Sequence, residues 1–181
     1  MQSVDEWAER IAREAVPEEV GQAPAVAHAF IEGGLPRRKT TRSLFGPDSA
    51  MVFQHILTAI NYAAPELRHF LGGLNTTTAE QLIGSAYFFF GAVSFRQSIR
   101  DRKEQAKSKA STDESAPAGN PPPDFQVEGL KRVHQSLKAA FPSDARIGEE
   151  EKDRIIGRTL AAMLEDPPGA AEFVREVEKA S

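Results

Sequence analysis

Histidines are the residues in this chain best suited to acid–base or metal chemistry, because the chain has no cysteine. There are four of them, His28, His55, His69 and His134. Glu66 and His69 match half of a carboxylate-bridged di-iron signature, which requires two such pairs and two further glutamates on facing helices. The second pair is absent, and His134 has no glutamate three residues before it. We therefore predict no metal site and no bound cofactor.

The motifs of covalent catalysis and of nucleotide binding are also missing from the sequence. There is no G-x-S-x-G turn, and Gly84 and Ser85 fall inside a predicted helix. The paired glycines at 33–34 and 72–73 have neither a following Lys-Ser nor a preceding strand, so they do not form a phosphate-binding loop. We therefore predict that the protein is not an enzyme, and we assign no catalytic or cofactor-binding residue.

Two clusters of basic residues are the best candidates for a binding surface. The first consists of Arg37, Arg38, Lys39 and Arg42, and the second is led by Arg96, Arg100 and Lys103. Hydroxyl residues lie between the charges of the first cluster, as in sites that bind an anion, a phosphate or an acidic protein. The second cluster falls near the end of a predicted helix, where basic residues also compensate the helix dipole. A solvated loop that pairs with the acidic N-terminal helix remains the alternative for the first cluster.

Charge is distributed unevenly along the chain, although the net charge is only −4. Residues 1–35 carry seven acids and two bases, residues 36–110 carry eleven bases and five acids, and residues 111–181 carry fourteen acids and nine bases. Such segregation indicates either internal pairing or a basic face that binds a partner. The overall acidity disfavours a general nucleic-acid binder.

Apolar residues recur at helical spacing along most of the chain, and no convincing strand pattern occurs. The predicted fold is all-α: a bundle of about five helices around a buried central helix at 1–106, and a three-helix segment at 124–181. Between them, residues 107–123 are rich in Pro, Ser and Lys and lack large apolar side chains, which predicts a flexible, disordered linker. The sequence leaves open whether the C-terminal segment packs on the bundle.

The first predicted helix begins at a capping box of Ser3 and Glu6 and ends before Pro17. Trp7 and Ile11 lie on its apolar face, which makes it a candidate docking helix, either for its own domain or for a partner. A later helix, starting at Asp48, is expected to break at Pro65 and to be followed by a short helix that closes at the second pair of glycines.

The most apolar predicted helix covers about residues 78–105, with a capping box of Thr77 and Glu80 at its start. Its uncharged stretch of fifteen residues is shorter than the roughly 20 residues of a membrane span. We therefore expect it to be buried at the centre of the bundle. The candidate lining of a ligand cavity on this helix is Tyr87, Phe88, Phe89 and Phe90.

The pattern at about residues 50–105, a helix ending in a double glycine and then the long apolar helix, resembles the effector-binding half of Tet-repressor-type regulators. The helix-turn-helix that should precede it is missing, because Pro17, Pro24 and Pro36 interrupt that region. We do not assign the chain to that family.

The leading hypothesis is a non-enzymatic, cytoplasmic helical adaptor or regulatory protein that binds another protein or itself. The N-terminus carries acids where a secretion signal needs basic residues, so we expect no such signal. A helical domain that binds a small molecule is one alternative. Binding of an anion or a nucleic acid through the basic clusters is another.

Overall fold

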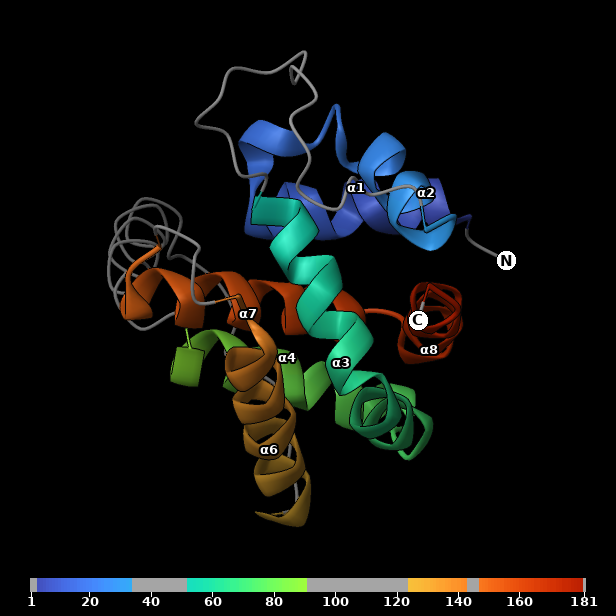
Figure 1. Ribbon diagram of the computed structural model, residues 1–181. Helices are drawn as coiled ribbons and strands as arrows, with labels where there is room; N and C mark the ends of the chain where they lie inside the picture. Colours follow the sequence, from blue (N-terminus) through green and yellow to red (C-terminus); the bar gives the residue numbers. More distant parts are fainter. Residues whose placement is uncertain (1–2, 34–51, 91–123, 143–146, 181) are drawn as a thin grey trace, which may run out of the picture.

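The computed structural model describes residues 3–33, 52–90, 124–142 and 147–180, without the side chains of 87–90. Every regular element in these ranges is helical, which confirms the predicted all-α fold. The helices are α1 (Val4–Ala15), α2 (Ala23–Ile31), α3 (Val52–Gly72), α4 (Thr76–Phe90), α6 (Asp124–Ala140), α7 (Glu149–Leu164) and α8 (Pro167–Glu178) (Figure 1). A short 3-10 helix, η1 (Pro17–Glu19), lies between α1 and α2. None of these helices is both long and apolar enough to cross a membrane.

Helices from both halves of the chain pack together (Figure 1). α3 and α6 lie side by side and run in opposite directions, while α7 crosses them and packs on α4. α8 packs against α3, and α1 lies against α2 and α7. One hydrophobic core contains residues from all these helices. The C-terminal helices therefore do pack on the N-terminal ones, whereas the predicted linker at 107–123 lies outside the described residues.

The start of α1 confirms the predicted capping box. The Glu6 N–H donates to the Ser3 hydroxyl at 3.2 Å, and the Ser3 N–H donates to the Glu6 carboxylate at 2.9 Å. Trp7 and Ile11 are 1% and 0% exposed, so this face is buried in the chain's own core. The Trp7 ring stacks on Phe173 of α8, with ring centroids 6.1 Å apart.

The predicted break at Pro65 is wrong, because α3 is one continuous helix with this proline inside it. Pro65 lies on the exposed side of α3, whereas Ala63, Ala64 and Leu67 around it are buried. A proline removes one backbone hydrogen bond from a helix and usually kinks or breaks it. Burial of the apolar face on both sides of Pro65 outweighs that loss here, since tertiary packing supplies most of the stability of a helix in a protein.

The N-terminus of α3 is held by a carboxylate from η1. Glu19 accepts the N–H of Val52 at 2.9 Å through one oxygen and the N–H of Phe53 at 2.8 Å through the other. The first N–H groups of a helix have no partner within the helix, and a negative charge there also complements the helix dipole. Glu19 thus fixes η1 to the beginning of α3.

α4 differs from expectation at its cap, and its burial can be described only as far as Ala86. The cap is Asn75, whose side-chain oxygen accepts the N–H of Thr78 at 2.8 Å, and not Thr77. From Thr76 to Ala86 the helix buries one face and exposes Glu80 and Gly84, so this part is not apolar all round. Among the described helices, the most completely buried stretch is 159–164 of α7. The burial expected of residues 87–95, the most apolar part of the predicted central helix, lies outside the described side chains and stays a prediction.

Candidate functional site

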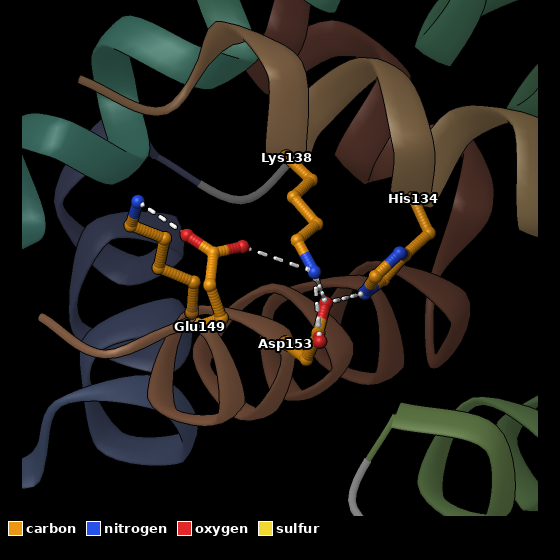
Figure 2. Close-up of polar contacts among 5 residues, drawn as sticks. His134, Lys138, Glu149 and Asp153 are labelled. Carbon is orange, nitrogen blue, oxygen red and sulfur yellow. Dashed lines mark hydrogen bonds and ion pairs between the residues drawn. The ribbon is translucent and has the colours of Figure 1, made fainter. Parts of the chain in front are cut away.

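Ionisable side chains gather where α6 meets α7 (Figure 2). We call this group, which consists of His134, Lys138, Glu149, Lys152 and Asp153, the α6–α7 cluster. His134 and Lys138 lie one turn apart on α6. Glu149 and Asp153 lie one turn apart on α7. The Lys138 ammonium donates to Asp153 at 2.9 Å and lies 3.3 Å from Glu149. Lys152 donates to Glu149 at 2.9 Å.

His134 is the most enclosed member of the cluster. It is 5% exposed, and its Nε2 lies 3.5 Å from a carboxylate oxygen of Asp153. Burial lowers the pKa of His134 from its ordinary value, although the negative charge of Asp153 opposes this shift. A carboxylate beside a histidine can orient a general base. Such a base must reach its substrate, and the burial of His134 leaves it in a structural position instead.

Contacts within the cluster favour the charged forms of Lys138 and Glu149. The hydrogen bond to Asp153 raises the pKa of Lys138 above its ordinary value. The hydrogen bond from Lys152, followed by that from Lys138, lowers the pKa of Glu149. Because these pairs are partly or largely open to water, each contributes little stability on its own. Only the contacts of Lys138 with Asp153 and Glu149 join α6 to α7, since the pair of Lys152 and Glu149 lies within α7.

A small apolar hollow lies between α3, α6 and α7. Its lining residues are Ile56, Ala59, Ile60, Leu137, Phe141, Ile156 and Thr159. Its volume is about 10 Å³, which is roughly the space of one water molecule. Ligand pockets usually measure about 300 Å³ or more, so this hollow is not a ligand site. The cavity predicted beside Tyr87 to Phe90 depends on side chains outside the described set and stays a prediction.

The half di-iron signature has another role in the structure. Glu66 accepts a hydrogen bond from the Ser136 hydroxyl of α6, while His69 is exposed on α3. Within 3–33, 52–90, 124–142 and 147–180, no three histidine or carboxylate side chains are grouped so that they could hold a metal ion. The contact of Glu66 therefore joins two helices.

Both predicted basic clusters lie outside the described residues. This applies to Arg37, Arg38, Lys39 and Arg42, and equally to Arg96, Arg100 and Lys103. Their roles stay predictions. The α6–α7 cluster was missed from the sequence, although the four-residue spacings of its lysine–histidine and glutamate–aspartate pairs are visible there. Those spacings place each pair on one helix face but do not show that the two faces meet.

The chain was compared with models of protein families, with curated proteins and with solved structures, and none of them matches it. Its function must therefore be argued from its own residues.

Proposed function

We propose that this chain is a non-enzymatic helical adaptor or regulatory protein of the cytoplasm, which acts by binding another protein. The observation that supports this is a contrast in charge between the described residues and two segments of the sequence. The described residues contain twenty acidic and eleven basic side chains. Segments 34–51 and 91–123 together contain ten basic and five acidic ones. The lack of cysteine also suits a reducing compartment.

Many charges of the described helices, which together we call the helical body, take part in contacts within the chain. Arg68 of α3 lies 3.2 Å from Glu178 of α8, and Arg158 of α7 donates to the backbone carbonyl of Glu14 at 3.4 Å. The α6–α7 cluster pairs two ammonium groups with two carboxylates. These contacts support a structural role for the charges of the body. The basic residues of the two segments are then the best candidates for attraction to an acidic partner surface.

The first experiment is affinity purification with cross-linking, together with light scattering of the purified chain. The test variant replaces Arg37, Arg38 and Lys39 with alanine. The control variant replaces Arg132, Arg175 and Lys179, which are three exposed bases of the described helices, and so removes the same charge. We expect a stable protein partner, or self-association, that the test variant weakens about tenfold or more and the control retains.

Three results would contradict the proposal. The first is a chain that binds no protein and does not self-associate. The second is an equal loss of binding in both variants, which would indicate a general charge effect. The third is binding that goes to nucleic acid and weakens steeply with salt, which would favour the alternative of phosphate contacts.

A further inference from the structure

The position of α6 depends on non-covalent contacts along one face of the helix. That face buries Leu130, Val133 and Leu137 against the body, and His134 lies among them. Among the described side chains, His134 is the one ionisable group that is buried. Its protonation would place a charge inside an apolar contact, which carries a large desolvation penalty unless a partner compensates it.

The nearby charges compensate poorly for a protonated His134. The Asp153 carboxylate lies 3.5 Å from the imidazole but already accepts from Lys138 at 2.9 Å. Glu149 is likewise engaged by Lys138 and Lys152. Within the α6–α7 cluster, two carboxylates thus already face two ammonium groups. An imidazolium would be a third cation, and Lys138 is only one turn away on the same helix.

The charged residues of the other helices that pack on α6 have contacts with groups other than His134, or are exposed. On α3, Glu66 contacts Ser136, while Arg68 pairs with Glu178 of α8. His55 of α3 lies against the Phe141 ring, with ring centroids 5.9 Å apart. The one charged residue in the sequence of α4, Glu80, is exposed. The charges that act on His134 are therefore chiefly those of Asp153 and Lys138.

We propose that the contact of α6 with α7 is a pH-sensitive device, in which protonation of buried His134 loosens α6 from the helical body. When His134 is neutral, the apolar face of α6 and the ion pairs hold the helix in place. When the solution is acidified, the proton binds more favourably to the detached helix, where water surrounds the ring. Release of α6 would expose its apolar face together with the surfaces of α3 and α7 that it covers.

Proton linkage determines how much the opening of α6 changes with pH. The pKa of a detached His134 is about 6.5, whereas burial lowers that of the docked residue. Protons therefore favour detachment as the pH falls below about 6.5. If the docked residue stays neutral, opening of α6 increases by up to about tenfold between about pH 7.5 and about pH 5.5. Glu149 keeps its charge over this window, because its pKa is lowered from an ordinary value that already lies below it.

Hydrogen exchange of the full chain, read by mass spectrometry at both pH values and corrected for intrinsic rates, tests this inference. We expect exchange in peptides from 124–142 to rise by up to about tenfold at the lower pH, with little change in α8. His134→Leu and His134→Gln both remove the titrating group, so either variant that folds should abolish the pH effect. His69→Gln, at an exposed histidine of α3, should retain it.

Several results would overturn the inference. One is an unchanged exchange rate of α6 in the wild-type protein. Another is an equal increase in α6 and α8, which would mean global acid unfolding. A third is a pH effect that survives in the His134 variants or disappears in His69→Gln. An NMR titration of the wild-type imidazole gives a test without mutation, because His134 must titrate over the same pH range in which α6 loosens.

Discussion

Removal of the Glu19 side chain provides a sharp test of how the helical body is held together. The carboxylate accepts two N–H groups at the start of α3, from Val52 at 2.9 Å and from Phe53 at 2.8 Å. Loss of a helix cap costs about 0.5–2 kcal/mol, and hydrogen bonds to charged groups contribute about 1.5–3 kcal/mol. The two bonds share one partly buried carboxylate, so we expect Glu19→Ala to lower the free energy of unfolding by about 2 kcal/mol.

Urea denaturation followed by tryptophan fluorescence measures this loss. Trp7 is the one tryptophan of the chain and is buried against Phe173, so its emission reports unfolding. With a slope of about 2 kcal/mol per molar urea, the midpoint should fall by about 1 M. The neighbouring Glu18 is exposed, and Glu18→Ala should move the midpoint by less than about 0.3 M. Equal midpoints for the two variants would refute the assigned role of Glu19.

Three further predictions concern stability, and thermal or urea unfolding checks each of them. Gly169→Ala should destabilise the protein by about 1–3 kcal/mol, because the added methyl group would collide with the Asp166 carboxylate that caps α8. Gly84→Ala should instead stabilise it by about 0.5–1 kcal/mol, since that position of α4 has open space and alanine favours the helix. A loss of stability in Gly84→Ala would contradict the described surface of α4. Leu67→Ala should cost about 2–5 kcal/mol, whereas Tyr62→Ala, at an exposed side chain of the same helix, should stay within about 0.5 kcal/mol. Similar losses for these two variants would show that the assignment of the buried face of α3 is wrong.

Local signals in the sequence predicted local features of the fold well. The capping box at Ser3 and the end of α1 before Pro17 follow from side chains that act within one helical turn. The residue that follows the end of α2 in the left-handed conformation is Gly33, with φ of 68°, and glycine is the residue that most often takes this position. These features depend on few neighbours, so the sequence was sufficient.

Features that depend on long-range packing could not be predicted in the same way. Pro65 is tolerated because buried residues on either side of it are held by α8 and α6. The carboxylate of Glu19 caps a helix that begins more than thirty residues later. The α6–α7 cluster forms only after two helices meet. The extensive burial of α7 likewise follows from contacts with neighbouring helices, because its sequence is less apolar than that of α4.

The pairing of α1 with α8 affects when this protein can finish folding during synthesis. Trp7 is buried partly by Phe173, and Arg158 reaches a backbone carbonyl 144 residues earlier. Such distant contacts slow folding, because long loops must close before the contacts form. On the ribosome, α2 can pack on α1 early, but the part of the apolar face of α1 that contacts α7 and α8 stays exposed until those helices have emerged from the exit tunnel. Nascent chains of this protein should therefore be good substrates for chaperones that bind exposed apolar segments.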